Sequence, residues 1–522
     1  MWGLAFVRTV RVFGVSLVGT EADLVSVEAR FEPVQRMRTQ LQLSGLPDAV
    51  IRESRSRLMA ALEENQLHVP NGKLVLNLAP AGLKKGGEGL DLPLALGAAA
   101  ACGHMSPRML NGTLFLGELG IDGRVHAVPG GFAAAEAAKR AGIKRIVCAP
   151  ATAAEAVCLP GIEVLAGDDL KQIVHWVVNK QGLERVRTPR ADEADAQGKP
   201  ASVRTSRALA GIRGQAAGKH ALAVAATGGH ALFFMGPPGI GKSLLAGALI
   251  ELLAPPNLDE RLDITRVLSA LGRWPGGLAT ERPYRAPHHT TSHAGLIGGG
   301  SPPHAGEITL AHCGVLFLDE LPEFRREVLE ALRQPLETGS VLIARASRTV
   351  EFPANFHLVC AANPCPCGYR GHPKLTCKCS PSEVWRYRRR ISGPLLDRMD
   401  LRVELAPPGI EELAQSSSEK QSTPINKTIE GRIREARSRM QRRQDGICNA
   451  QLDTDGLDEH VPLHPASRTF FAKVAETRDL SARGVQSLRR VARTLADLQG
   501  RKEVHEIHLA EALALRAPLF DQ

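Results

Sequence analysis

One octapeptide constrains this chain more than any other feature, because it combines a glycine-rich loop with a preceding apolar run and a following helix-like stretch. Its residues are Gly236, Pro237, Pro238, Gly239, Ile240, Gly241, Lys242 and Ser243. The spacing G-x-x-x-x-G-K-S turns backbone N–H groups toward phosphates, brings the lysine to the β- and γ-phosphates and offers Mg²⁺ a hydroxyl ligand. The alternative is a chance glycine loop, which the flanking strand and helix patterns disfavour. The loop predicts an α/β core that binds ATP.

A second apolar run, Val315 to Leu318, ends in the adjacent carboxylates Asp319 and Glu320. We expect Asp319 to hold Mg²⁺, directly or through water, and Glu320 to orient and polarise the attacking water. An ordinary acidic loop is the alternative, and the preceding Leu-Phe-Leu disfavours it. The two motifs together predict a site for nucleotide hydrolysis.

Three more polar residues follow at places where a nucleotide could be sensed. Asn363 ends another buried-looking run, and its amide could contact the γ-phosphate and hold the water. Arg398 follows Leu-Leu-Asp, and Arg483 stands at a predicted helix start near the C-terminus. From the pattern alone, isolated arginines are more often solvated surface residues.

Composition narrows the class of protein. A chain of 522 residues predicts two to four domains, and 43% hydrophobic with 23% charged residues is typical of a soluble globular protein. A formal charge of +10 favours an anionic partner such as nucleic acid. Aromatic residues make up only 4%, which favours phosphate contacts over extended base stacking. The N-terminus has no signal-peptide pattern and no run is long enough to cross a membrane, so we expect a cytoplasmic protein.

Shifts in composition predict the organisation of the chain. Residues 1–178 alternate strand-like and helix-like stretches, with helices expected over 48–63 and 91–101 and a strand over 73–78. A polar stretch, 179–207, is interpreted as a linker. The ATPase core is expected over 208–405, with the helix after the phosphate loop over 243–253, and 406–522 is expected to form a helical lid.

Four of the ten cysteines stand close together, as Cys365-x-Cys367 and Cys377-x-Cys379. Four thiolates in a short polar loop suit a tetrahedral structural Zn²⁺ ion. The alternative is four free thiols, which usually prefer apolar surroundings. The remaining six cysteines are interpreted as core or incidental residues.

The segment Val341–Phe352 is predicted to form a hairpin, with Arg345 and Arg348 near its tip. We expect these two arginines to contact DNA phosphates, and a solvated tip is the alternative. Two other basic runs, Arg386–Arg390 and Arg432–Arg443, could also contact DNA; a charged helix face or a subunit interface is the default interpretation of the second.

The order of these motifs resembles that of AAA+ ATPases on the magnesium-chelatase side of the superfamily, and more narrowly the ComM/YifB family. The stretches that carry the closer resemblance are Ile212–Gln215, Arg282–His289, Asn363–Tyr369, Ser481–Gly484 and Arg490–Thr494. The resemblance implies a homo-hexameric ring with ATP between subunits. It implies that Lys242, Ser243, Asp319 and Glu320 are the Walker residues, Asn363 is sensor 1, Arg398 is an arginine finger offered to a neighbouring subunit, and Arg483 is sensor 2.

The resemblance also implies a DNA helicase that acts on single-stranded or branched DNA and promotes branch migration in homologous recombination during natural transformation, with recombination proteins as partners. A chelatase-like motor that remodels proteins without acting on DNA fits the same core. The N-terminal part is similar to the Lon-protease-like domain with its ribosomal-S5 fold, through residues 82–93, 117–125 and 129–132. Leu90 and Phe132 stand about where that family has its catalytic serine and lysine, so proteolysis is not expected.

Overall fold

The computed structural model of the chain describes residues 9–34, 39–46, 48–80, 89–187, 209, 212–274, 276–300, 303–345, 348–407, 424–477 and 480–516. The chain divides into two compact units. The first comprises residues 1–197, 258–279 and 344–352, and the second comprises 198–257, 280–343 and 353–522. Within the described ranges we find no helix with the length and apolar character needed to cross a bilayer.

The first unit is built on an eight-stranded mixed sheet with the strand order β10-β9-β8-β5-β1-β2-β4-β3. β2 pairs antiparallel with β1 and β4, whereas β1, β5, β8 and β9 run parallel. The strands are β1 (Val10–Val18), β2 (Glu21–Pro33), β3 (Gln40–Ser44), β4 (Gly72–Ala79), β5 (Thr113–Leu116), β8 (Arg145–Cys148), β9 (Glu163–Ala166) and β10 (Glu184–Val186), with a separate hairpin of β6 (Glu118–Leu119) and β7 (Val125–His126).

Helices pack on this sheet and produce two apolar cores. One core contains the buried helix α2, and the other contains α3 and α4. The helices are α1 (Asp48–Glu64), α2 (Asp91–Ala101), α3 (Gly131–Arg140), α4 (Pro150–Ala156), α5 (Leu170–Asn179) and α10 (Leu258–Ala270), with the 3-10 turn η1 (Pro107–Leu110). Leu90 and Phe132 are both fully buried, one in each core. The two positions that matter for proteolysis in the Lon-like resemblance are therefore packing positions here.

Two features of the first unit differ from the organisation expected along the sequence. Strand β10 lies inside the range interpreted as a linker, and it extends the sheet by pairing antiparallel with β9. Helix α10 comes from the range expected to form the ATPase core, yet it packs on α3. Arg266 of α10 makes a two-pronged ion pair with Glu136 of α3, at 2.6 and 2.8 Å. Contacts distant in sequence thus override a boundary drawn from composition.

The second unit contains a five-stranded parallel sheet with the order β12-β15-β18-β11-β19. The strands are β11 (Leu232–Met235), β12 (Tyr284–Arg285), β15 (Val315–Leu318), β18 (His357–Ala362) and β19 (Leu401–Glu404), and the short pair is β13 (Gly298–Gly299) with β14 (His304–Ala305). The three central strands are fully apolar along β11 and β15 and nearly so along β18, which is typical of a parallel sheet covered on both faces.

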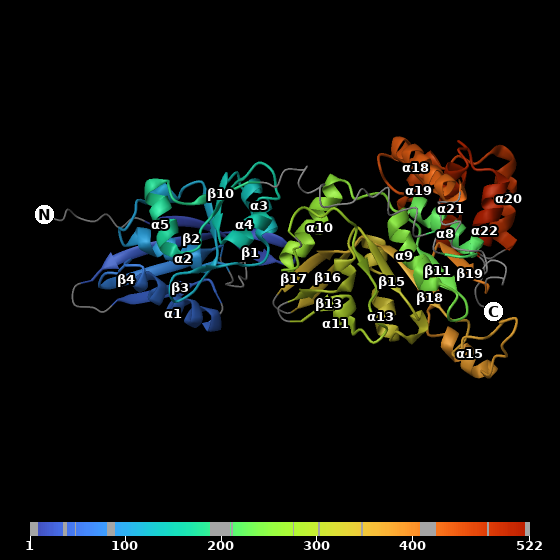
Figure 1. Ribbon diagram of the computed structural model, residues 1–522, viewed down its shortest axis with the longest axis horizontal. Helices are drawn as coiled ribbons and strands as arrows, with labels where there is room; N and C mark the ends of the chain where they lie inside the picture. The colour runs from blue at the N-terminus through green and yellow to red at the C-terminus, as the bar shows by residue number, and fades with distance from the viewer. Residues whose placement is uncertain are drawn as a thin grey trace. The chain divides into compact units, whose positions relative to one another are not determined.

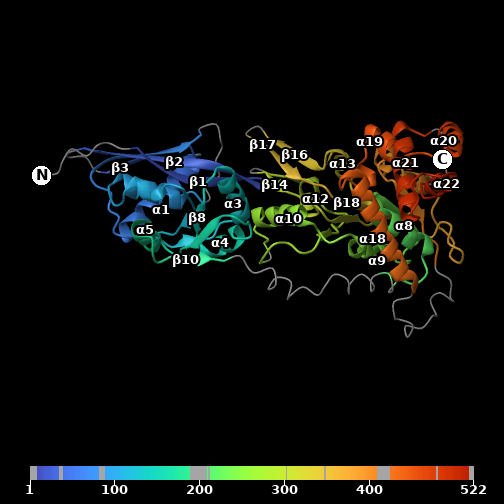
Figure 2. The ribbon, with the colours of Figure 1, turned by 90° about the horizontal axis from the view of Figure 1, so that it is seen from above.

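Helices surround this sheet and continue into a C-terminal helical region, as predicted. They are α8 (Ala216–Gly228), α9 (Lys242–Leu252), α11 (His293–Leu296), α12 (Glu307–Leu310), α13 (Arg326–Ala331), α14 (Pro335–Thr338), α15 (Pro381–Arg388), α16 (Gly393–Leu396), α18 (Pro424–Gln444), α19 (Thr454–His460), α20 (Pro465–Thr477), α21 (Ala482–Leu498) and α22 (Glu506–Ala514), with 3-10 turns η3 (Leu321–Glu323) and η5 (Asn449–Gln451). Helices α18 and α21 contact each other and α8 (Figures 1 and 2).

The predicted hairpin is present as β16 (Ser340–Arg345) and β17 (Arg348–Pro353), directly before β18. Its outer part, 344–352, groups with the first unit, and Val350 and Phe352 are buried. The side chains of Arg345 and Arg348 lie outside the described part of the structure, so their contact with DNA stays a prediction.

Candidate nucleotide site

The parallel sheet of the second unit brings the sequence motifs together. In register, Met235 of β11 lies beside Ala362 of β18, and Leu318 of β15 lies beside Cys360 of β18. Because the strands are parallel, their carboxyl ends meet at one edge of the sheet. The residues that follow these three strands are the glycine-rich loop, Asp319 with Glu320, and Asn363.

The loop between β11 and α9 is closed by Lys242, the first residue of the helix. Its ammonium donates hydrogen bonds to the carbonyls of Gly236 and Pro237, at 2.7 and 2.9 Å, and to Asn363 Oδ1 at 2.9 Å. Lys242 is 8% exposed. Burial lowers the pKa of Lys242, while the charges of Asp319 and Glu320 act in the opposite direction.

Close packing explains why the loop starts with glycine. A Cβ on Gly236 would lie 2.3 Å from Ile240 Cδ1 and 2.7 Å from the carbonyl oxygen of Leu405. The loop is also held by Gln215, whose side-chain amide donates hydrogen bonds to the carbonyls of Ile240 and Ala406, at 3.3 and 2.9 Å. Gln215 thus ties the loop to the chain that follows β19. Gln215 ends the Ile212–Gln215 stretch that carries the family resemblance, but no sequence pattern indicated that its side chain holds the phosphate loop.

The two groups predicted to bind Mg²⁺ lie next to each other. Ser243 Oγ donates to Asp319 Oδ2 at 2.9 Å, and Asp319 Oδ1 accepts from the backbone N–H of Glu320 at 2.9 Å. A hydroxyl and a carboxylate at the N-terminus of α9 are hard oxygen ligands of the kind that Mg²⁺ prefers. The residues present therefore fit a nucleotide-bound Mg²⁺ ion, which would neutralise phosphate charge here.

Glu320 has a left-handed backbone conformation, with φ of 52°. Such a conformation is uncommon for a residue other than glycine, and backbone strain of this kind clusters at functional sites. Its carboxylate contacts His289 Nδ1 at 3.1 Å. His289 ends the Arg282–His289 stretch that carries the family resemblance. Its place after β12, the strand that neighbours β15, brings it to Glu320, and only the strand order reveals this contact.

The two predicted arginines converge on one carboxylate. Arg398 and Arg483 both form an ion pair with Glu337, which follows η3 and α13 in the chain. The hydrogen bond from Arg483, and the charge of Arg398, lower the pKa of Glu337 against the opposing effect of desolvation. Arg398 also donates to the Pro394 carbonyl at 2.7 Å. The sequence offers no signal for Glu337, which lies 61 and 146 residues from its partners.

A buried polar network lies close in the chain to both arginines, since Asp400 follows Arg398 and Ser487 follows Arg483. Asp400 accepts a hydrogen bond from Ser487 and contacts His230 Nδ1 at 3.0 Å, and His230 Nε2 lies 2.7 Å from Thr494 Oγ1. Ser487 and Thr494 are on α21, the helix that starts beside Arg483. Burial raises the pKa of Asp400, but its contacts with His230 and Ser487 outweigh burial, so the net shift is downward. The network joins α21 to Asp400, the residue directly before edge strand β19.

The four clustered cysteines meet in the loop after β18. All four sulfur atoms lie within 4.8 Å of one another, with Sγ–Sγ distances of 3.4 Å for Cys365–Cys367 and 3.6 Å for Cys365–Cys377 and Cys367–Cys377. Zinc–thiolate bonds of about 2.3 Å in a tetrahedron put sulfurs about 3.8 Å apart. Backbone N–H groups of Tyr369 and Lys378 lower the pKa of Cys367 to about 6. The donor set fits a zinc ion.

The cysteine loop also contacts the nucleotide site. Gly368, within its first turn, has a φ of 83°, and a Cβ at this position would lie 2.7 Å from Pro238 Cδ and 3.9 Å from Asn363 Cγ. The glycine-rich loop, Asn363 and the cysteine cluster are therefore packed as one assembly.

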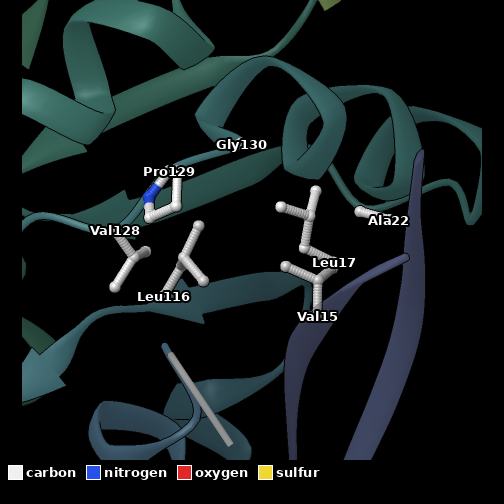
Figure 3. A pocket seen from close by; sticks show the side chains of 7 residues that line it. All are labelled: Val15, Leu17, Ala22, Leu116, Val128, Pro129 and Gly130. Atoms are coloured by element: carbon white, nitrogen blue, oxygen red, sulfur yellow. The ribbon is translucent and has the colours of Figure 1, made fainter. Parts of the chain in front are cut away.

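A small pocket in the first unit has a different character. Its volume is about 20 Å³. Figure 3 shows its apolar walls, which are formed by Val15, Leu17, Ala22, Leu116, Val128, Pro129 and Gly130. Without polar or titratable side chains, this pocket is not a candidate catalytic site.

An α/β core with a phosphate loop, a carboxylate pair on the neighbouring strand end and a helical C-terminal region defines an AAA+ protein of the magnesium-chelatase type. Residues 208–413 match the family described as magnesium chelatase, subunit ChlI, and residues 425–516 match its C-terminal family. Residues 30–152 match the family described as subunit ChlI of Mg-chelatase. The Lon-like interpretation of the N-terminal part stays a prediction.

Within this class, the chain belongs to the ComM/YifB family. It is 36% identical to YifB of Salmonella typhimurium over 98% of this chain and 97% of that protein. It is 36% identical to the competence protein ComM of Haemophilus influenzae over 97% of each chain. YifB of Escherichia coli is 35% identical over 96% of this chain and 95% of its own length. The resemblance read from short stretches is confirmed over nearly the whole length.

Proposed function

We propose that this protein is an ATPase that moves along single-stranded or branched DNA as a homo-hexamer and promotes branch migration. The observation that carries the ATPase part is the arrangement at the sheet edge, where Lys242 contacts Asn363 and Ser243 contacts Asp319. These groups form the part of a Mg²⁺–triphosphate site that one subunit supplies. Glu320, beside them, is the residue we assign to orient water for attack on the γ-phosphate.

The place of Arg398 and Arg483 supports an assembly in which the site is completed by a second subunit. Both arginines form ion pairs with Glu337, and neither pairs with Asp319 in the nucleotide site of the same chain. An arginine supplied by a neighbour neutralises transition-state charge only when the ring is assembled. We therefore assign Arg398 as the arginine finger and Arg483 as sensor 2.

Full-length similarity to a competence protein and the net charge of +10 support DNA as the track, and natural transformation as the setting. The test is steady-state ATPase activity of the purified protein with and without oligo(dT) and with a four-way junction, together with branch-migration assays on a labelled junction. We expect DNA to stimulate the ATPase activity. We also expect ATP-dependent branch migration to convert the labelled junction into separate duplexes. Lys242→Ala should abolish both.

A protein-remodelling motor is the second candidate, because residues 208–413 and 425–516 match families of the magnesium chelatase subunit ChlI. ATPase activity that ignores every DNA tested, with no DNA binding in any nucleotide state, would favour this second function. A casein digestion control distinguishes either motor from a protease.

The cysteine cluster is assigned a structural role. We propose that Cys365, Cys367, Cys377 and Cys379 hold one Zn²⁺ ion as four thiolates. The support is the mutual distance of the sulfurs and the N–H groups directed at Cys365 and Cys367. Metal analysis of the purified protein tests this assignment, with one zinc per chain expected.

A further inference from the structure

The segment that carries the cysteine cluster also exposes an aromatic ring among positive charges. Residues 365–390, the cysteine lobe, contain seven lysines or arginines and one acidic residue, Glu383, which is a net charge of +6 in a chain of +10. Four thiolates with a bound zinc ion would contribute −2 and leave the lobe at about +4. Figure 1 shows α15, the helix of this lobe, at the margin of the second unit and apart from the lid helices α20 and α22.

Helix α15 presents Trp385 to solvent. Val384 and Tyr387, on its inner side, are buried, and Ser380 with Glu383 forms a capping box that fixes the start of the helix. Trp385 is 60% exposed, although the Arg389 guanidinium lies over its ring at 4.6 Å from the centroid. The described part of the chain exposes several large apolar side chains, and among these Trp385 is the aromatic one.

The charges around the ring divide into two groups. Arg388 and Arg390 donate hydrogen bonds within the protein, to the carbonyl of Pro364 and to Pro322 with Glu323, although the side chain of Arg390 is 49% exposed. Arg386, Arg389 and Lys378 are exposed beside Trp385 and the cysteine turn. An exposed indole next to cationic side chains matches a single strand of nucleic acid, in which an unpaired base stacks on the ring and adjacent phosphates meet the arginines.

We propose that the cysteine lobe is a contact site for single-stranded DNA, with Trp385 as the base-stacking residue and Arg386 and Arg389 as phosphate contacts. A duplex does not fit as well, because its bases are stacked on each other and cannot offer a free face to the indole. The proposal rests on the proposed function and adds a place where the strand is held beside the nucleotide site. Gly368 of the same lobe packs on Pro238, so the segment that would hold the strand contacts the phosphate loop.

Binding of a fluorescein-labelled oligo(dT) to the full-length hexamer, followed by anisotropy with a non-hydrolysable ATP analogue, tests the proposal. Trp385→Ala is expected to weaken binding about 5- to 150-fold, the range for loss of one stacked base. Trp385→Phe is expected to retain most of the affinity, because it keeps an aromatic face. Ile507→Ala is the matched control, since Ile507 of α22 is 64% exposed and should have no effect. Arg386→Gln is expected to reduce the salt dependence of binding by the equivalent of about one phosphate contact.

Photo-crosslinking with oligo(dT) that carries 5-iodouracil provides a direct readout, with Trp385 expected as the modified residue. Zinc content and light scattering of each variant show whether the lobe and the ring are intact. Equal affinity of Trp385→Ala and wild type, when the wild type does bind DNA, overturns the stacking site and leaves the proposed function standing. A wild type that binds no DNA overturns both. Loss of assembly in Trp385→Ala, with no crosslink to Trp385 in a wild type that binds DNA, would instead make Trp385 a subunit contact and overturn the proposal.

Discussion

The ammonium of Lys242 donates a hydrogen bond to the side-chain oxygen of Asn363 at 2.9 Å, across 121 residues of sequence. The first residue of α9 and the first residue after β18 are thereby connected. Lys242 and Asn363 are the neighbouring groups that would meet the phosphates of a bound nucleotide together.

Replacement of Asn363 by alanine removes this contact and leaves every residue of the phosphate loop unchanged. We expect ATPase kcat to fall about 100- to 1000-fold, the range for loss of one positioned polar group that stabilises the transition state. Binding of a fluorescent ATP analogue should change by less than about tenfold, because Lys242 and the loop N–H groups remain. Comparable losses in affinity and in kcat would contradict a sensing role for Asn363.

The contact between the cysteine loop and Pro238 is tested by a matched pair of glycine substitutions. In Gly368→Ala, the new Cβ would lie 2.7 Å from Pro238 Cδ at a φ of 83°. In Gly371→Ala, φ is 77° and no atom lies within 4 Å of the new Cβ. Both variants carry similar backbone strain, of about 1 kcal/mol. We expect only Gly368→Ala to raise the KM for ATP, and equal KM values would show that the packing is of no consequence for the site.

The shared carboxylate of Glu337 predicts how arginine variants behave in mixtures. Arg398→Ala and Lys242→Ala should each lose ATPase activity, with a loss of about 10³–10⁵-fold for an arginine finger. Mixed before assembly, they should recover part of it, because a Lys242→Ala subunit still offers Arg398 to a neighbour. Since Arg483 contacts the same carboxylate, we expect Arg483→Ala to recover with Lys242→Ala as well.

One subunit could supply Arg398 and Arg483 to the same nucleotide or to two different nucleotides. A mixture of Arg398→Ala with Arg483→Ala distinguishes these two arrangements. If one subunit supplies both arginines to one nucleotide, no subunit in this mixture is complete, and activity stays low. Substantial recovery would place the two arginines at different nucleotides. ATPase rates of defined mixtures, with light scattering to confirm assembly, decide between these outcomes.

Asp400 predicts an acid limit to the packing of α21. Its pKa is lower in the folded protein than the ordinary value of about 3.9, so its contribution to stability is complete at neutral pH and is lost as pH falls from about 5 toward the lowered pKa. Asp400→Asn should reduce stability at pH 7 by about 1–3 kcal/mol, because His230 and Ser487 lose a charged acceptor.

Thermal unfolding between pH 7 and pH 3 measures this effect. The decrease in Tm on acidification should be smaller in Asp400→Asn than in wild type, since the variant has no carboxylate to protonate. Glu459→Gln is the control, because the side chain of Glu459 is 76% exposed and should leave the profile unchanged. Parallel profiles for all three proteins would rule out Asp400 as the source.

Loss of one thiolate should release the metal. Cys377→Ser is expected to reduce zinc content below one per chain and to lower Tm, because the three remaining sulfurs cannot complete the tetrahedron. Cys102→Ser is the control, since Cys102 is half-buried outside the cluster and burial raises its pKa to about 12. Zinc measured by plasma mass spectrometry at equal levels in wild type and Cys377→Ser would contradict the assignment.

Local sequence signals predicted several elements of this protein. The helices expected over 48–63 and 91–101 are α1 and α2, and the helix expected over 243–253 is α9, one residue earlier at each end. The hairpin before β18 was also predicted. These succeed because periodicity, capping and turn residues act over a few positions, and because a phosphate loop carries its own spacing.

Contacts between distant residues could not be predicted in this way. The sequence by itself determined that a phosphate loop, two carboxylates, an amide and four close thiols exist, since each is written in a short run. Only the tertiary structure decided that α10 packs on the first unit, that His289 reaches Glu320, and that one glutamate receives both Arg398 and Arg483. The physical reason is that strand order and helix packing set these contacts, and both depend on burial of apolar surface summed over the whole chain rather than on any local pattern.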